Sequence, residues 1–275
     1  AKVSVSIPYN NISGKVITNI TENTVTDAIK LAQQRAVAKG IGKNDISIEI
    51  NVNTGNSQVN TLNINFPKKV QTQLIQQQVK YVQVKNNSIG ITLDDKALKQ
   101  INDTINSDVS IYANKINNQS LSLESKNIVG NRKVYDIKIV GNNGKIISNF
   151  NNGKVTVSIP YIPSANQKVE NIVAVYIDTN QKVHYISNSS YDFQNKTLMF
   201  VTDHFSLYGI GYKDSLPLEF NDTVNHWAKS DIDFVTTRGL LNGLGNNKFS
   251  PDTPITRGML ITALGKLVNI NINNY

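Results

Sequence analysis

The chain contains no cysteine, which excludes disulfide bonds, thiolate metal sites and a cysteine nucleophile. Its three histidines, His184, His204 and His226, are far apart in the sequence and lack the spacing of metal ligands. No apolar run approaches the roughly eighteen residues that a membrane helix needs. We therefore expect no metal site, no cofactor and no insertion into a membrane.

The 275 residues are 39% hydrophobic and 17% charged, which suits about two or three compact units and argues against a disordered chain. The chain begins at Ala1 without a methionine and ends in an Asn- and Ile-rich stretch that has no clear stop. We expect a chain whose leader has been removed or, more in keeping with the far end, a fragment of a longer protein.

The net charge of +8 is distributed unevenly. Residues 1–213 hold 23 basic and 14 acidic residues, whereas the segment from Asp214 onward is about neutral. An anionic partner such as a wall polymer, a nucleic acid or a membrane surface would suit this balance. However, the lysines are scattered singly among asparagines, which is typical of a solvated surface. We expect no nucleic-acid binding.

Residues 1–119 show strand and helix patterns in alternation, which predicts a mixed α/β part. Helices are expected over about Val25–Lys39, capped by Asn23 or Thr24, from Pro67 to about Gln78, and from Asp94 or Asp95. Period-two alternation predicts the strands, which are Lys2–Ile7, Ile46–Val52, Val59–Phe66, Tyr81–Val84, Ile89–Leu93 and Val109–Ile116.

Residues 120–213 lack helical periodicity, and Asn-Gly pairs at Asn143-Gly144 and Asn152-Gly153 indicate tight turns. Alternating runs predict an antiparallel, sandwich-like β module. Its expected strands are Val134–Val140, Val155–Ile159, Ile172–Ile177, Val183–Ser187, Thr197–Val201 and Phe205–Tyr212. The fold class predicted for the whole chain is α+β.

Residues 214–275 follow a third pattern, in which seven features occur in a fixed order. They are Phe220-Asn221-Asp222, His226-Trp227-Ala228, an amphipathic helix, Gly239 with Gly243, Phe249-Ser250-Pro251, Ile255-Thr256-Arg257, and a second helix. Asp222 or Asn225 can cap the first helix, and Thr253 or Thr256 the second. The second helix should place Met259, Leu260, Ala263, Leu264 and Leu267 inward.

These features closely resemble an S-layer homology repeat, over about 50 residues. The resemblance implies that three repeats form a three-fold prism whose grooves bind a secondary cell-wall polymer. Carried over to this chain, it implies polymer contacts at Trp227, Arg257 and Gly245, with Asp222 as a weaker candidate. An arginine can grip a carboxylate such as a pyruvate ketal with forked hydrogen bonds, and an indole can stack on a sugar ring.

The sequence departs from the family's T-R-A-E motif, because Thr256-Arg257 is followed by Gly258 and Met259. The repeat can therefore be a structural member of its set. Each candidate also has a simpler explanation: Trp227 as a core or interface aromatic, Arg257 as the partner of a local carboxylate, and the glycines as turn and cap positions.

The stretch from Asp203 to Tyr212 is similar to the T-x-H-F-S-x-Y ending of β-rich modules that precede such repeats in large surface proteins. This second, looser resemblance covers most of residues 1–213. It implies a spacer or presentation role.

Catalytic motifs such as Gly-x-Ser-x-Gly, H-E-x-x-H, a Walker loop and an EF-hand loop are absent. Asp203, His204 and Ser206 contain the letters of a triad, but neighbours in a strand point to opposite faces, so we expect no hydrogen bond between Asp203 and His204. Asp231 and Asp233 are expected to be solvated on their helix. A carboxylate pair for glycan hydrolysis is not recognisable from sequence.

The sequence thus predicts a non-catalytic, extracellular protein of the bacterial wall or S-layer. We expect residues 1–119, 120–213 and 214–275 to form three segments, the last of them the first of several repeats. Expected partners are a pyruvylated secondary wall polymer and neighbouring repeats, with packing of the lone repeat on residues 1–213 or self-association to cover its apolar side. The alternatives are an extracellular ligand- or polysaccharide-binding module on a wall tether, and a wall-associated hydrolase.

Overall fold

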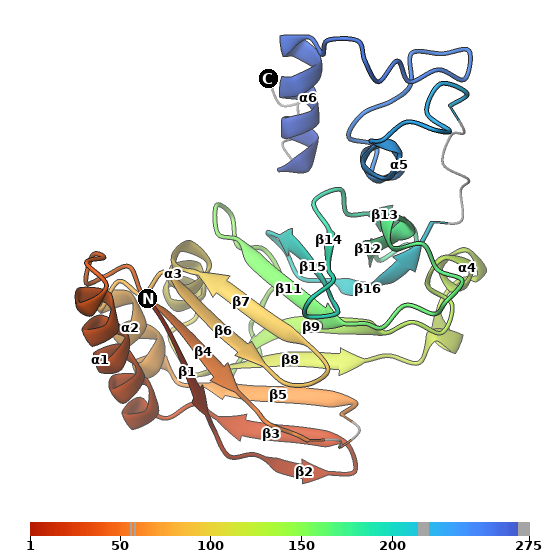
Figure 1. Cartoon of the computed structure of the whole chain (residues 1–275). Helices are drawn as coiled ribbons and strands as arrows, with labels where there is room; N and C mark the ends of the chain where they lie inside the picture. The colour runs from red at the N-terminus through yellow and green to blue at the C-terminus, as the bar shows by residue number, and fades with distance from the viewer. Residues whose placement is uncertain (56, 58, 214–219, 269–275) are drawn as a thin grey trace. The chain divides into compact units, whose positions relative to one another are not determined.

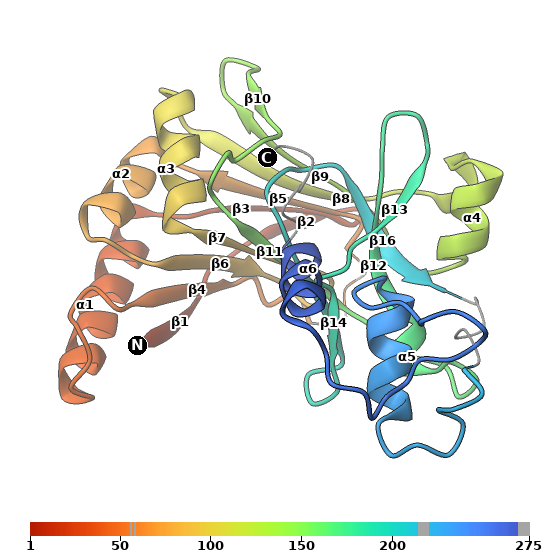
Figure 2. The same ribbon diagram turned by 90° about the horizontal axis from the view of Figure 1, so that it is seen from above.

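The computed structural model describes all residues except 56, 58, 214–219 and 269–275. The chain divides into two compact units (Figures 1 and 2). The first contains residues 1–120, 133–160 and 201–208, and the second contains residues 121–132, 161–200 and 209–275. The units are interleaved along the chain, whereas the predicted segments 1–119, 120–213 and 214–275 follow one another.

One sheet of the first unit has the strand order β1-β4-β6-β7-β11. β1, β4 and β6 are parallel, and β7 and β11 continue the sheet antiparallel. Valine, isoleucine and leucine side chains alternate with polar ones, so one face is apolar and the other polar. The strands are β1 (Lys2–Ser6), β4 (Ser47–Asn51), β6 (Tyr81–Lys85), β7 (Gly90–Asp94) and β11 (Val155–Pro160).

The second sheet of this unit has the order β9-β8-β5-β3-β2, with β10 on β9. β3 and β5 are parallel, and the other pairs are antiparallel. The strands are β2 (Asn10–Ile12), β3 (Lys15–Asn19), β5 (Thr61–Phe66), β8 (Val109–Lys115), β9 (Val134–Gly141) and β10 (Ile146–Ile147).

Three helices gather on one side of the first unit in both views: α1 (Glu22–Ala38), α2 (Lys68–Gln76) and α3 (Asp95–Thr104). α1 buries the stripe Val25, Ala28, Ile29, Ala32 and Ala36, as its periodicity predicts. Its N-cap is Thr21, whose hydroxyl accepts from the Thr24 N–H, so the helix begins earlier than predicted. Asp94 caps α3 as predicted. A 3-10 turn at Asn118–Ser120 ends this stretch.

The second unit contains a further short 3-10 turn (Val169–Asn171) and the hairpins β12 (Ile172–Ile177) with β13 (Val183–Tyr185) and β14 (Ser190–Asp192) with β15 (Thr197–Thr202). It also contains most of β16 (Leu207–Tyr212), and the helices α4 (Leu123–Val129), α5 (Lys229–Thr237) and α6 (Arg257–Leu267).

The chain combines helices and strands, as the predicted α+β class requires, and strands dominate it. The absence of helices within residues 120–213 was wrongly predicted, because α4 forms behind the N-cap Ser122, whose hydroxyl accepts from the Ser125 N–H. Two strands of the β-rich segment, β9 and β11, pair with β8 and β7 of the preceding segment. Alternation predicts a strand but carries no information about its partner.

Candidate functional site

The first loop of the repeat, Phe220 to Thr223, is held against the loop that contains Phe249 and Ser250. The Asp222 carboxylate accepts from the backbone N–H groups of Phe249 (3.0 Å) and Ser250 (2.8 Å). The hydrogen bond from Phe249 is the main cause of a lowered pKa for Asp222. The prediction that Asp222 or Asn225 caps the first helix was wrong: α5 has Ala228 as its N-cap, with no side-chain cap bond. Asp222 joins two loops instead.

The two loop glycines near this contact have different structural causes. A Cβ on Gly243 would lie 2.2 Å from a ring carbon of Phe220, so close packing requires glycine there. Gly245 has φ +95°, and Asn246 and Asn247 follow at φ 50° and 55°. Gly245 and Lys248 pair across this tight turn. Gly245 is therefore explained by turn geometry, and the space around its Cα is open.

Trp227 lies on the surface, with 87% of its area exposed. The described structure thus excludes the alternative that Trp227 is a core residue of this chain. Its neighbour His226 accepts from the Ala228 N–H through Nδ1 (3.2 Å) and contacts the Asp252 carboxylate through Nε2 (3.3 Å). His226 therefore connects the tryptophan loop to the Phe249–Asp252 loop, a role that the sequence analysis missed.

Arg257 begins α6 directly after its N-cap Thr256, whose hydroxyl accepts from the Met259 N–H (3.2 Å). Thr256 was one of the two predicted caps. Arg257 is exposed and its side chain forms no hydrogen bond or ion pair with any described residue, so the alternative of a local carboxylate partner is not observed. Among the described residues, no such contact joins any two of Trp227, Arg257, Gly245 and Asp222.

The apolar side of α6 is not buried within the described residues. Met259, Leu260, Leu264 and Leu267 are all exposed, so their predicted inward position was wrong for this chain. No described residue covers this face, so its predicted burial stays a prediction about a neighbour.

α5, in contrast, is held by Arg238, which sequence reasoning treated only as part of the motif. Arg238 is 4% exposed. Its guanidinium donates to the carbonyls of Ser189 (2.9 Å), Ile172 (2.9 Å) and Glu170 (3.0 Å). Burial lowers the pKa of Arg238 to about 10. The repeat is thus packed on the β12–β14 region, one of the two arrangements predicted for a lone repeat.

Arg238 has further contacts that fix its orientation. Its guanidinium carbon lies 3.7 Å from the centroid of the Phe234 ring. Asp233, predicted to be solvated, is instead 4% exposed and ion-paired with Lys229 at 2.8 Å. α5 therefore buries an acidic residue that is ion-paired, and its C-cap Arg238 is a buried basic residue that is hydrogen-bonded to carbonyls.

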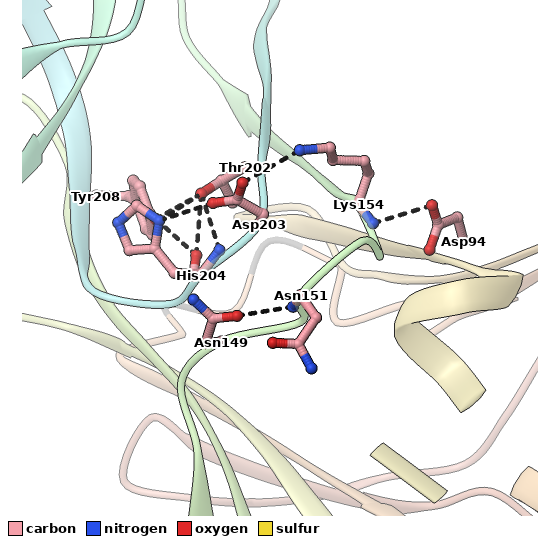
Figure 3. A network of polar contacts seen from close by, with 8 residues as sticks. All are labelled: Asp94, Asn149, Asn151, Lys154, Thr202, Asp203, His204 and Tyr208. Atoms are coloured by element: carbon pink, nitrogen blue, oxygen red, sulfur yellow. Dashed lines mark hydrogen bonds and ion pairs between the residues drawn. The ribbon is translucent and has the colours of Figure 1, made fainter. Parts of the chain in front are cut away.

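A polar network surrounds Asp203 and His204 (Figure 3). His204 Nδ1 lies 3.2 Å from Asp203 Oδ1, so the expectation that the two cannot share a hydrogen bond was wrong. They lie in a bend after β15, where strand alternation does not apply. Burial alone would raise the pKa of Asp203, but hydrogen bonds from His204 and Lys154 lower it.

The same network closes the turn before β16. The Tyr208 hydroxyl donates to the His204 carbonyl (2.7 Å), and the Thr202 hydroxyl contacts both groups. The Lys154 ammonium reaches Asp203 (3.1 Å), and its backbone N–H donates to Asp94 (2.9 Å). The Thr, His and Tyr of the T-x-H-F-S-x-Y pattern are thus explained by hydrogen bonds that hold this turn together. Among the described residues, no cluster of three His, Asp or Glu side chains could hold a metal ion.

Residues 219–258 match the family model of the S-layer homology domain. The chain therefore contains an S-layer homology domain, and such a domain indicates association with the cell surface and wall. Such domains in general bind secondary cell-wall polymers. No helix of the described residues is long and apolar enough to span a membrane.

The chain is also similar to an amylopullulanase of Thermoanaerobacterium thermosulfurigenes, with 29% identity over 195 residues. The match covers 69% of this chain but spans 9% of the length of that relative.

Proposed function

We propose that this chain is the wall-anchoring part of a non-catalytic, extracellular surface protein, and that its repeat binds a pyruvylated secondary wall polymer. The observation that carries the proposal is the state of Trp227 and Arg257. Both are exposed, and Arg257 has no partner among the described residues. A large indole and an unpaired guanidinium on a surface are the groups that an acidic glycan would use.

The proposed chemistry assigns different roles to the candidate residues. Arg257 donates forked hydrogen bonds to the carboxylate of a pyruvate ketal, and Trp227 stacks on a sugar ring. Asp222 and Gly245 shape the neighbouring loops, since their contacts and backbone angles are explained within the chain. Met259 takes the place of the motif's acidic residue, so this repeat contributes less affinity than a repeat with the full motif.

Neighbouring repeats are the proposed cover for the exposed face of α6, and self-association is the alternative. Each would bury the apolar side chains that the described residues leave in solvent. Residues 1–213 then act as a spacer or surface-layer module.

Two other functions compete with this one. Residues 1–213 can bind an extracellular ligand such as a polysaccharide while the repeat serves as a tether, which a polar pocket in the first unit favours. A wall-associated hydrolase is less well supported: the structural turn uses Asp203 and His204, and the likeness to the amylopullulanase extends over only 9% of that enzyme.

The test is co-sedimentation of the whole chain with Gram-positive wall sacculi, before and after chemical removal of the secondary polymer. We expect binding that disappears with the polymer and falls at least about five-fold in Arg257→Ala and Trp227→Ala, since each loses about 1 kcal/mol or more. Binding that persists on stripped sacculi would contradict polymer recognition.

Matched variants separate this effect from general changes in surface charge or hydrophobicity. Arg35→Ala removes an exposed arginine of the first unit, and Phe193→Ala removes an aromatic that is 70% exposed. Both should bind as well as the wild type. Equal losses in Arg257→Ala and Arg35→Ala would show non-specific attraction to an acidic wall instead of a site in the repeat.

A further inference from the structure

A pocket of about 680 Å³ lies in the first unit, where β3 and β5 end and α1 and α2 begin. Its polar lining consists mainly of amides and carboxylates: Asn19, Asn23, Asn65, Asn142, Glu22 and Asp108. Asn19 and Asn65 are cross-strand partners at the carboxyl ends of two parallel strands, and ligands of α/β sheets commonly bind at such ends. The volume falls within the roughly 300–1,000 Å³ typical of ligand pockets.

Two of the amides are oriented by a chain of hydrogen bonds. The Ser110 hydroxyl donates to Asn65 Oδ1 (2.9 Å), and the Asn65 amide donates to Asn19 Oδ1. Asn19 therefore accepts through its oxygen and keeps the two N–H groups of its own amide as donors. The strand register and the hydroxyl hold these donors in place before any ligand arrives.

The acceptor side of the pocket is oriented by a helix start. Pro67, the N-cap of α2, has no side-chain cap bond, and Asp108 Oδ1 accepts from the Lys68 N–H instead (2.8 Å). The second oxygen of Asp108 remains an acceptor. The side chains of Asn23 and Asn142 form no hydrogen bond with the described residues, so they add two amides that can both donate and accept.

The lining limits the class of ligand. It contains two carboxylates, of which Glu22 is ion-paired with Lys69 (3.7 Å), and no lysine or arginine, so an anionic ligand would find no cationic side chain in the lining. It contains no aromatic side chain, so a flat aromatic ligand would find no stacking partner. Its donors and acceptors are mixed, and a small apolar part is supplied by Ile20, Pro67 and Val109. A ligand that carries several hydroxyl groups on a partly apolar ring would match such a lining.

We propose that this pocket binds a neutral saccharide, with sugar hydroxyls accepting from the Asn19 amide and donating to the Asp108 carboxylate. The site belongs to the first unit and uses no residue of the repeat, so it goes beyond wall anchoring. The chain would then hold a neutral glycan with one unit and an acidic wall polymer with the repeat. Because the pocket is open and its side chains are solvated, we expect a dissociation constant of about 0.1–1 mM.

The test is titration of the full, ¹⁵N-labelled chain with maltohexaose, cellohexaose and chitohexaose, each up to 10 mM, followed by NMR. We expect one of them to saturate and to shift the backbone amides of Thr21–Asn23 and Lys68 and the side-chain amides of Asn19, Asn65 and Asn142. Saturation by none of the three, or shifts confined to the second unit, would overturn the proposal. Shifts produced by calcium chloride but by no saccharide would also overturn it.

Two variants test the assigned groups. Asp108→Asn keeps an oxygen for the Lys68 N–H but loses the charged acceptor, and we expect about ten-fold weaker binding. Asn142→Ala removes an exposed side-chain amide that forms no hydrogen bond with the described residues, with an expected loss of about three-fold. The matched control is Asp103→Asn, an exposed carboxylate on α3 outside the lining. Equal affinity of Asp108→Asn and the wild type would overturn the assignment.

The outcome is distinguishable from that of the anchoring proposal. Arg257→Ala should leave saccharide binding unchanged, and Asp108→Asn should leave co-sedimentation with sacculi unchanged.

Discussion

The two helices of the repeat differ in how they meet the rest of the described chain. α5 buries Ile232, Asp233 and Thr237, and Arg238 follows it in a fully enclosed position. α6 is the more apolar of the two in sequence, yet it buries no residue. Apolar periodicity therefore predicts which face of a helix requires cover. It does not predict whether the same chain provides that cover.

The difference has a physical cause in the partners that each helix finds. Arg238 donates to backbone carbonyls of the β12–β14 region and stacks on Phe234, so α5 is held by hydrogen bonds that alternative packings would leave unmade. Among the described residues, α6 is joined to a distant part of the chain by one hydrogen bond, from the Lys266 ammonium to the Gly239 carbonyl (2.8 Å). A single, partly buried hydrogen bond does not fix a helix against a core.

The largest expected effect is that of Arg238→Ala. The change would leave three buried carbonyls without a donor, and we expect α5 to lose about 3–5 kcal/mol of protection. Hydrogen exchange of the α5 amides measures this loss. Arg238→Lys keeps the positive charge but lacks the several N–H donors of the guanidinium. The protection of its α5 amides should therefore lie between that of Arg238→Ala and that of the wild type. Protection in Arg238→Ala close to that of the wild type would mean that α5 is held by other contacts.

A pair of matched truncations tests the contrast between the helices directly. Ile232 is 4% exposed and Leu264 is 50% exposed. Ile232→Ala should destabilise the second unit by about 2–4 kcal/mol, and Leu264→Ala should change its stability by less than about 0.5 kcal/mol. Urea unfolding at low protein concentration measures both. A loss above about 2 kcal/mol for Leu264→Ala would show that α6 is covered in solution, contrary to its exposed state here.

Glu49 offers a comparison in the first unit, because it is also buried and charged but is paired with side chains. Its carboxylate contacts Lys2, Lys85 (2.9 Å) and the Ser4 hydroxyl (2.9 Å). Burial alone would raise the pKa of Glu49, but the hydrogen bonds from Lys2, Lys85 and Ser4 lower it to about 2 from 4.5.

The lowered pKa of Glu49 gives a stability contribution that depends on pH. Because the folded pKa lies below the unfolded one, the contribution is complete above about pH 4.5 and is lost as the pH falls to about 2. We expect Glu49→Gln to cost about 1–2 kcal/mol at pH 7, since both lysines are partly exposed. Urea unfolding across this range should show the difference from the wild type disappear in acid. If the stability difference between Glu49→Gln and the wild type stayed the same across this pH range, its cause would be packing and not the charge of Glu49.

The smallest expected effect concerns the first turn of α6. Met259 is the third helical residue after the N-cap Thr256, where a glutamate could reach back to the Thr256 N–H and complete a capping box. Met259→Glu should stabilise this turn by about 0.5–1 kcal/mol, seen as slower exchange of its amides. Leu260→Glu, one residue further on, is the control that should lack the effect. Equal effects would indicate a general gain from acidic residues near the helix start.

Local signals in the sequence were sufficient for much of the fold. Asp94 as a cap, Pro67 before a helix, the strand Ile172–Ile177 and the cap Thr256 were all predicted from residue type and spacing, and the structure has them. The short strands β2, β3 and β14 were not predicted, nor was α4. Each is short or carries little alternation, so pairing with a neighbour decides its structure.

The candidate site divides in the same way. Order and spacing were sufficient to recognise the repeat and to select Trp227 and Arg257, which the structure places on the surface. His226 and Asp222 connect loops through backbone groups, and no residue pattern marks such a bond in advance. The pocket at Asn19 and Asp108 joins residues about 90 positions apart, which strand pairing alone brings together.

The sequence by itself determined a fold of mixed helices and strands, the starts of α2, α3 and α6, the main strands and the membership of the repeat. Caps, periodicity and motif order are local properties. Tertiary structure alone decided that β9 and β11 pair with the preceding segment, that Arg238 is buried and that α6 remains exposed. Those outcomes depend on which distant groups satisfy a hydrogen bond or cover an apolar face. A local sequence pattern predicts that a partner is needed, but it does not predict which distant residue provides it.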